Sequence, residues 1–334
     1  MRKIYIKTTE TCNLHCKHCY IGDNRTKQGF FNAEKTIAWL KKQIDNGKNT
    51  LISFHGGEPF LCSLDEMQKV CDAFPEAEFD ATSNLCFKNI KPIMAFIQKN
   101  FIRNETGKQF VKTSWDYDIR FPNKEAQHLW ENNVKTLLKN NIDVKVITCL
   151  SSKFIHNVSP IAYKEYIKQL GVNEIDFERL TANTTKKKEL LPNYDEVDEW
   201  LLDFYENNDC FEVGMFANMA AAVCGTFIDC RARHCMQNTY TINANGTIGG
   251  CPNTAIIDWF ADISGQNNII KRNELIKHEC VRNPVCYTCE LYRVCNGDCH
   301  QLSWKDGKCP EPKKLLRRII DDVAEKKNTL VFDA

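Results

Sequence analysis

Three cysteines near the N-terminus have the spacing of a metal-binding loop. Cys12, Cys16 and Cys19 fall within eight residues, in the order C-x3-C-x2-C. Cysteine thiolates are the usual protein ligands of iron–sulfur clusters, so this loop can hold three irons of a [4Fe–4S] cube. No fourth ligand lies nearby in the sequence, so one iron would stay open to bind another molecule. A zinc knuckle is the alternative that the spacing alone allows.

A glycine-rich turn, Gly56-Gly57-Glu58-Pro59, follows the second strand-like segment of the chain. Glycine lets the backbone approach a ligand closely. The carboxylate of Glu58 can meet an ammonium group. In isolation the tetrapeptide would indicate only a turn, and its place after the cysteine loop makes it a candidate ligand site.

A second group of cysteines occupies the C-terminal third of the chain. Cys235 is followed by Gly246 and Cys251, and a C-x2-C-x5-C-x3-C series then precedes a last cysteine: Cys286, Cys289, Cys295, Cys299 and Cys309. The chain has 18 cysteines and no secretion signal, which favours metal or cluster binding over disulfides. Pairs of the C-x2-C type also suit tetrahedral zinc, so a zinc ribbon is the alternative.

Together these motifs resemble two known families. The cysteine loop, with His18 before its last cysteine, and the Gly-Gly-Glu-Pro turn resemble the signature of the radical S-adenosylmethionine (radical SAM) superfamily. The later cysteines resemble its SPASM extension, and the match covers about residues 3–310. The resemblance implies a peptide or protein maturase, similar to anaerobic sulfatase-maturating enzymes and to the maturases of ribosomally made peptides (RiPPs). It implies that the open iron binds SAM, which reductive cleavage converts to a 5′-deoxyadenosyl radical that abstracts hydrogen.

The resemblance also implies the cofactors, SAM and three [4Fe–4S] clusters, and their ligands. The residues expected around SAM are Tyr20, Gly56, Gly57, Glu58, Pro59, Ser83, Ser114 and Thr148. One auxiliary cluster would use Cys230, Cys235, Cys251 and Cys299, and the other Cys286, Cys289, Cys295 and Cys309. Cys230 is favoured over Cys224 because family members have a cysteine about five residues before the Cys235 position.

Three positions depart from the family's pattern. Leu85 and Tyr117 stand where glycines often follow the third and fourth strands. Pro252 stands where anaerobic sulfatase maturases usually carry an aspartate that acts as a base. Asp116, together with Asp118, is therefore the candidate catalytic base, although solvated turn residues would look the same.

Strand-like and helical segments alternate over the first two thirds of the chain, as in an α/β fold. The expected strands are Lys3–Thr9, Thr50–His55, Glu78–Ser83, Phe110–Trp115, Asp143–Leu150 and Glu174–Leu180. Six such units agree with a partial (β/α)6 TIM-like radical SAM barrel followed by a cysteine-rich SPASM iron–sulfur domain. A doubly wound open sheet is the alternative. We expect a barrel over residues 1–207, a bridging region over 208–223, the SPASM domain over 224–310, and a C-terminal helix and tail over 311–334.

Helix boundaries follow from capping residues and apolar spacing. Asn32 can cap a helix with Ile37, Leu40 and Ile44 on one face, and Asp195 can cap a helix that carries Trp200. The apolar spacing of Lys313–Lys327 predicts a closing helix that packs on one of the two domains.

Composition limits the partners. With 44 basic and 43 acidic residues, the charge balance does not indicate binding to nucleic acid or to a membrane surface, and no apolar run approaches the length of a membrane span.

We expect a cytoplasmic protein that oxidatively modifies a peptide or protein side chain. Its other partner would be a reductant such as flavodoxin or ferredoxin. Because the first strand begins at residue 3, we expect any leader peptide to be recognised by a separate protein or by the barrel itself. The alternatives are a radical SAM modifier of a small molecule, and a non-catalytic iron–sulfur carrier or zinc-supported binding protein.

Overall fold

The structure is a computed structural model, and it describes residues 2–22, 29–104, 106–180, 188–302, 304–305 and 307–325. The strands are β1 Arg2–Thr9, β2 Thr50–Gly56, β3 Glu78–Ala81, β4 Gln109–Ser114, β5 Ile142–Leu150, β6 Glu174–Arg179, β7 Glu212–Val213, β8 Thr239–Ile242, β9 Thr247–Gly249 and β10 Trp259–Asp262. The α-helices are α1 Ala33–Leu40, α2 Leu64–Ala73, α3 Lys91–Asn100, α4 Lys124–Lys139, α5 Ser152–Asn157, α6 Pro160–Leu170, α7 Tyr194–Glu206, α8 Gly214–Val223, α9 Asp229–Ala232, α10 Cys235–Asn238, α11 Ile269–Cys280, α12 Tyr292–Cys295 and α13 Lys313–Glu325. Short 3-10 helices cover Pro59–Leu61, Lys188–Leu190 and Pro284–Thr288.

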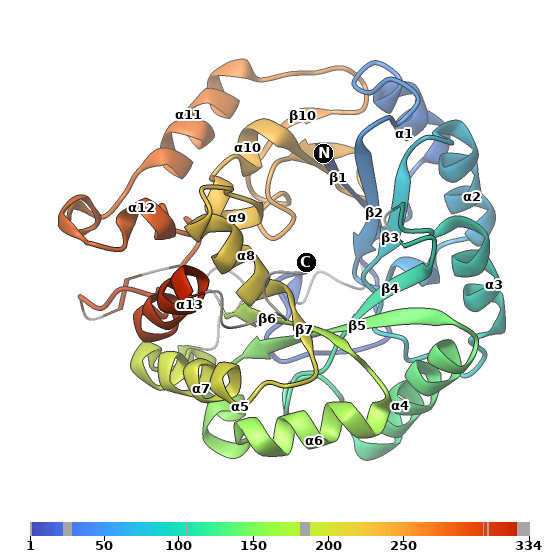
Figure 1. Ribbon diagram of the computed structural model, residues 1–334. Helices are drawn as coiled ribbons and strands as arrows, with labels where there is room; N and C mark the ends of the chain where they lie inside the picture. Colours follow the sequence, from blue (N-terminus) through green and yellow to red (C-terminus); the bar gives the residue numbers. More distant parts are fainter. Residues whose placement is uncertain are drawn as a thin grey trace.

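Strands β1 to β6 run parallel in sequence order around a partial barrel. β1, β2 and β3 form one set and β4, β5 and β6 another. A parallel bridge between Thr82 and Lys112 joins the two sets at the β3–β4 step. Helices α1 to α4 and α6 lie outside these strands (Figure 1). The predicted class, an α/β partial barrel, is confirmed, and its strands begin and end within two residues of the expected positions.

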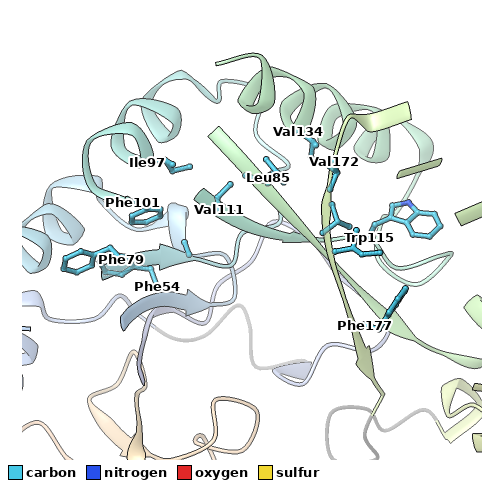
Figure 2. Packing of buried hydrophobic residues seen from close by; sticks show 14 of the residues in the cluster. Phe54, Phe79, Leu85, Ile97, Phe101, Val111, Trp115, Val134, Val172 and Phe177 are labelled. Atoms are coloured by element: carbon cyan, nitrogen blue, oxygen red, sulfur yellow. The ribbon is translucent and has the colours of Figure 1, made fainter. Parts of the chain in front are cut away.

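The strands of the barrel bury one face against the helices and turn the other toward the lumen. On β1, Ile4 and Ile6 are completely buried in the core, while Tyr5 on the opposite face packs edge-on against His55. Between β2, β3 and α3, the rings of Phe79 and Phe101 each stack with the ring of Phe54, at centroid distances of 6.1 Å (Figure 2). Polar side chains on the other strand face are thus left to line the lumen.

The cysteine-rich C-terminal part continues the barrel sheet. β8 pairs parallel with β1, with Lys3 opposite Thr239 and Ile6 opposite Ile242. β9 and β10 follow as antiparallel strands. On the other edge, the two-residue strand β7 pairs with β6. Helices α9 to α12 lie across the ring from α2 and α3 (Figure 1).

Capping side chains define several helix ends. Asn32 caps α1 as expected, because its Oδ1 accepts a hydrogen bond from the Lys35 amide. The cap expected at Asp195 is instead Asn193, whose Oδ1 accepts from the Asp195 amide, so Asp195 lies in the first turn of α7. Of the expected closing helix, Lys326 and Lys327 fall outside the described residues.

Helix α13 packs on α7 and α8 and is capped from another helix. Leu315, Leu316 and Ile319 on its inner face are completely buried. The carboxylate of Asp198, on α7, accepts hydrogen bonds from the amides of Lys314 (2.8 Å) and Leu315 (3.0 Å). These amides belong to the first turn of α13, which has no earlier helical carbonyl to receive them. One buried carboxylate therefore fastens the C-terminal helix to the barrel.

Among the described residues, no helix combines the length and the apolar character that crossing a membrane requires.

We expect the Asp198→Ala variant to lower the free energy of unfolding by about 1–2 kcal/mol, because two amides at the start of α13 lose their acceptor. The control is Glu199→Ala, which removes only an exposed ion pair to the side chain of the same Lys314 and should cost less than about 1 kcal/mol. Chemical denaturation of both variants measures the difference. Equal losses would show that Asp198 does not act as the cap.

Candidate active site and cluster sites

The N-terminal cysteine loop leaves the end of β1 and is held by backbone and side-chain contacts. The Leu14 side chain is buried in the core, and its amide donates a hydrogen bond to Cys12 Sγ over 3.3 Å. Asn84, directly after β3, reaches the same loop: its Nδ2 donates to Asn13 Oδ1 at 2.6 Å and to Cys12 Sγ at 3.6 Å. The loop therefore lies at the carboxyl ends of β1 and β3, where parallel α/β barrels place their active sites.

The three thiols of this loop lie close enough to affect one another's ionisation. All are free and only partly buried. The pKa of Cys16 is raised to about 12, mainly by burial and to a smaller extent by the neighbouring thiols Cys19 and Cys12. Burial also raises the pKa of Cys12. Metal binding would reverse this preference, because a coordinating thiol is deprotonated outright. The loop is thus suited to a metal that replaces the thiol protons.

The Gly56-Gly57 turn touches the cysteine loop through its backbone. The Gly57 amide donates to the Thr9 carbonyl over 2.8 Å, and the Glu58 amide donates to the Thr11 carbonyl over 2.9 Å. A Cβ atom on Gly57 would lie 2.2 Å from the Thr11 oxygen. Gly56 has a φ of +135°, and a Cβ there would lie 2.1 Å from the Thr9 oxygen. Both positions therefore require glycine, and the contact they allow sets the start of the cysteine loop.

Glu58 presents a buried, preorganised carboxylate beside this loop. Its side chain is completely buried. Oε1 accepts from the Phe60 amide and the Ser83 hydroxyl, and Oε2 from the Asn84 amide at 2.6 Å. Burial raises the pKa of Glu58 to about 7, against the effect of these donors. A carboxylate offers about four lone-pair sites, so one acceptor position is left for a ligand donor.

The other side chains expected around SAM are divided between the site and its surroundings. Tyr20 joins the site: its hydroxyl donates to the Gly56 carbonyl over 3.3 Å and lies 3.4 Å from His55 Nδ1. Pro59 opens the 3-10 helix after Glu58, and Ser83 is committed to the Glu58 carboxylate. Ser114 ends β4 half-buried. Thr148 lies on the helix-facing side of β5, where its hydroxyl hydrogen-bonds Tyr163 at 2.8 Å.

Asp116 is buried within a polar network at the end of β4. Oδ1 accepts from the Cys149 amide at 2.7 Å, and Oδ2 lies 3.2 Å from Arg120 Nη1 and 3.5 Å from His18 Nε2. These contacts link the loop residue before Cys19 to β4 and β5. The exposed Asp118 forms ion pairs with Lys153 and Lys17 instead. The assignment of Asp116 as a base stays a prediction.

Four cysteines of the C-terminal part gather near the β1 edge of the barrel. Cys299 and Cys235 both lie close enough to Cys230 to raise its pKa. Cys251 and Cys299 both raise the pKa of Cys235. The structure thus brings together the four residues expected for one auxiliary cluster. The alternative, Cys224, is the C-cap residue of α8 and is exposed, as Cys230 also is.

The other four cysteines line a single cavity. Its walls contain Cys286, Cys289, Cys295 and Cys309, and the remaining lining residues include Leu291, Tyr292, Trp304 and Glu311. Four thiols around one mostly apolar cavity fit a fully ligated cluster, and they fit tetrahedral zinc as well.

Two charged side chains of the lumen were missed in the sequence. Glu178, on β6 opposite Cys149 of β5, faces the lumen and has no ion-pair or hydrogen-bond partner among the described residues. The Glu178 side chain is exposed to solvent, but the surrounding barrel wall, and then the charge of Asp176, raise its pKa to about 7. Lys7, on β1, is fully buried, and its Nζ likewise has no hydrogen-bond partner in the described part of the chain. Period-two alternation on each strand could have placed both in the lumen, but no sequence signal shows that they are unpaired.

Comparison with known proteins supports the cluster loop and the fold. Residues 4–101 match the family described as "4Fe-4S single cluster domain". An uncharacterized protein of Methanocaldococcus jannaschii, MJ0907, is 24% identical over 210 residues, which cover 60% of this chain and 70% of that protein.

Solved structures of similar fold include two maturases. The anaerobic sulfatase-maturating enzyme anSMEcpe, with bound AdoMet, aligns with a TM-score of 0.79 at 16% identity, covering 99% of this chain and 97% of that chain. SuiB of Streptococcus suis, bound to the precursor peptide SuiA, aligns with a TM-score of 0.59 at 15% identity, covering 92% and 76%. The chain therefore has the fold of radical SAM/SPASM enzymes, which confirms the resemblance seen in the sequence.

We expect the Gly57→Ala variant to lower the free energy of unfolding by about 1–3 kcal/mol, because the added methyl group must push the Thr11 carbonyl and the cysteine loop away. The same variant should bind less iron per chain after reconstitution. Gly29→Ala is the matched control, since a Cβ there meets no atom within 4 Å. Denaturation and iron analysis of the two variants check this, and an unchanged Gly57→Ala protein would contradict the close approach.

Proposed function

We propose that this protein is a radical SAM/SPASM enzyme that reductively cleaves SAM and oxidatively modifies a side chain of a peptide or protein. The observation that carries the proposal is the contact between the three-cysteine loop and the Gly56–Glu58 turn. That contact puts three thiols and one preorganised carboxylate at the same strand ends. A loop that only carried electrons would have no use for an open iron beside a ligand-binding carboxylate.

The residues around the loop fit SAM and a [4Fe–4S] cluster. Cys12, Cys16 and Cys19 would hold the cluster, and Glu58 would accept a hydrogen bond from the methionine amine of SAM. Tyr20, held against the Gly56 carbonyl, would form the neighbouring wall. When bound, the cluster supplies the electron that cleaves SAM. The chain's own contribution is to position the SAM amine and to surround it with buried side chains that exclude water.

Two gathered sets of four thiols support two auxiliary [4Fe–4S] clusters. Cys230, Cys235, Cys251 and Cys299 would hold one, and Cys286, Cys289, Cys295 and Cys309 the other. Neither set would leave an iron open, which suits electron transfer better than substrate ligation. Removal of an electron from a substrate radical gives an oxidised product, so the reaction proposed is an oxidation, a dehydrogenation or a crosslink.

A peptide or protein substrate is supported by the two similar folds, because anSMEcpe was solved with the Cp18Cys peptide and SuiB with its precursor peptide.

The oxidation also needs a group that takes a proton. Pro252 follows Cys251, so that position offers no acid. Glu178 is the carboxylate that faces the lumen without a partner among the described residues, and a pKa near 7 suits a proton acceptor at neutral pH. A flavodoxin or ferredoxin would act as reductant, and a separate protein could bind a leader peptide.

The proposal is tested by anaerobic reconstitution, followed by dithionite and SAM. We expect roughly twelve irons per chain, as three cubes require, and 5′-deoxyadenosine detected by mass spectrometry. The Cys12→Ala variant should retain the auxiliary clusters and form no 5′-deoxyadenosine. If the wild-type protein forms no more of it than Cys12→Ala does, the catalytic proposal is wrong. Zinc in place of iron after expression in iron-rich medium would favour a binding protein.

The affinity for SAM should rise with pH between about 6 and 7 and level off above. The pKa of Glu58 is raised to about 7, so at lower pH the carboxyl is protonated and is a poorer acceptor for the amine. Each pH unit below the pKa should weaken binding up to about tenfold. Equilibrium binding of SAM to the reconstituted protein across this pH range measures the slope.

The Glu58→Gln variant should bind SAM about 10- to 100-fold more weakly at pH 8, because it loses a charged hydrogen-bond acceptor. Its affinity should also lose the dependence on pH between 6 and 7. Glu10→Gln serves as the control for a buried carboxyl of the same region. A pH slope that persists in Glu58→Gln would assign the titration to another group.

A further inference from the structure

Lys7 is a buried cation that forms no ion pair with any described residue. It lies near the carboxyl end of β1, its side chain has 0% exposure, and Nζ makes no hydrogen bond within the described residues. The ammonium lies 4.8 Å from the centre of the Tyr20 ring, a contact that supplies only part of the lost hydration. Glu10 is near enough to raise the pKa of Lys7, but the two do not form an ion pair. A buried charge without a partner is costly in free energy, so a bound anion near Lys7 would stabilise the folded protein.

The other lysines of the lumen show how this chain ordinarily treats such a charge. Lys112 Nζ lies 2.6 Å from the Asp80 carboxylate, and Lys145 Nζ lies 3.0 Å from the Glu174 carboxylate. Both ammonium groups are thus neutralised within the barrel wall. Burial lowers the pKa of Lys7 to about 8, which still leaves it positively charged at neutral pH. Lys7 differs from these two lysines in being completely buried and in having no carboxylate at bonding distance among the described residues.

The register of the sheet puts Cys251 beside this lysine. Tyr5, two residues before Lys7 on the same strand face, pairs with Thr241 of β8. The Thr241 hydroxyl donates to the Gly250 carbonyl over 2.7 Å, which holds the residue before Cys251 against the barrel edge. The charges agree with this placement, because Lys7 lowers the pKa of Cys251 and Cys251 raises that of Lys7. Cys19 of the N-terminal loop acts on Lys7 in the same direction, with a smaller effect.

We propose that Lys7 is the counter-charge of the iron–sulfur cluster held by Cys230, Cys235, Cys251 and Cys299, and that it raises the reduction potential of that cluster. This inference rests on the auxiliary cluster of the proposed function. The four thiolates carry more negative charge than the positive charge of the iron–sulfur core, so the bound cluster is a net anion. It would supply the negative charge that Lys7 lacks in the protein without clusters. A nearby cation stabilises the reduced, more negative form, and net charge around a cluster is one of the factors that set its potential.

Lys7 lies near both Cys19 and Cys251, so a higher reduction potential of the Cys251 cluster would favour electron transfer from the substrate radical. After hydrogen abstraction, the substrate radical must lose one electron and one proton to become a closed-shell product. With the auxiliary cluster bound, that cluster would take the electron, and a base in the lumen would take the proton. A higher potential at the cluster beside Lys7 makes that cluster the better electron acceptor. Lys7 is therefore a positioning and tuning residue that acts through the cluster, without contact with the reacting atoms.

The test compares the reduction potentials of the clusters in reconstituted wild-type, Lys7→Met and Lys7→Arg proteins, by redox titration followed with EPR. The background is Cys12→Ala, which removes the signal of the N-terminal cluster. In Lys7→Met, the cluster at Cys251 should shift to a more negative potential, while the cluster at Cys286–Cys309 should not move. Lys7→Arg, which keeps the positive charge, should stay close to the wild-type potential. Thermal unfolding gives a second readout: Lys7→Met should raise the melting temperature of the metal-free protein and lose this gain once the cluster is loaded.

The double variant Lys112→Met/Asp80→Asn is the matched control, because it removes another lumen lysine together with its partner and so leaves the net charge unchanged. It should leave both potentials where they are. If Lys7→Met forms the Cys251 cluster at an unchanged potential, the inference is wrong, and Lys7 serves another anion such as a substrate carboxylate. If the wild-type protein forms no cluster at Cys251 at all, the failure lies with the proposed function, and the iron count identifies it.

Discussion

The backbone contact between the ends of β1 and β2 is the constraint on which the candidate site depends. The β1–β2 ladder shifts register between Lys7 and Thr9, so that Gly56 comes to lie opposite Thr9. No side chain fits between the two strands at that level, because Cβ atoms on Gly56 and Gly57 would overlap with carbonyl oxygens. The shift turns the chain so that Glu58 points across to the end of β3. One close approach thus determines where the cysteine loop starts and where the carboxylate stands.

A second constraint joins the two groups of auxiliary cysteines to the barrel. Arg179, at the end of β6, forms an ion pair with Asp298, the residue before Cys299. Arg231, the residue after Cys230, binds Glu311 at 2.7 Å and donates to the Cys295 carbonyl. Buried ion pairs add little net stability, but removing one partner leaves a buried charge behind and is costly. The network therefore contributes mainly to specificity, because it holds one position from each cysteine group in a fixed relation.

Sequence patterns were sufficient for the strands, because these depend on local alternation of apolar residues. The family resemblance, and not local spacing, grouped the thiols that the structure brings together. The misses depend on contacts that local patterns do not encode. Asn193 and Asp195 are both good caps, and only the side-chain bond distinguishes them. Thr148 and Cys149 are neighbours on β5, and a shift of one residue in a strand exchanges the two faces. β8 pairs with β1 although the two segments are more than 200 residues apart, and the sequence of neither segment predicts which strand it pairs with.

The distribution of charge in the lumen relates these features to one another. Three lysines of the lumen are matched: Lys3 pairs with Asp229, Lys112 with Asp80, and Lys145 with Glu174. Toward the carboxyl ends, Lys7 on one wall and Glu178 on the other have no partner among the described residues. Parallel barrels carry out their chemistry at the carboxyl ends of the strands and rely on the opposite end for stability. The chain thus pairs three lysines of the lumen with carboxylates and leaves Lys7, the one near Cys19 and Cys251, without a carboxylate at bonding distance among the described residues. An unpaired lysine beside the proposed electron acceptor and an unpaired carboxylate elsewhere in the lumen fit a reaction in which the substrate gives up one electron and one proton.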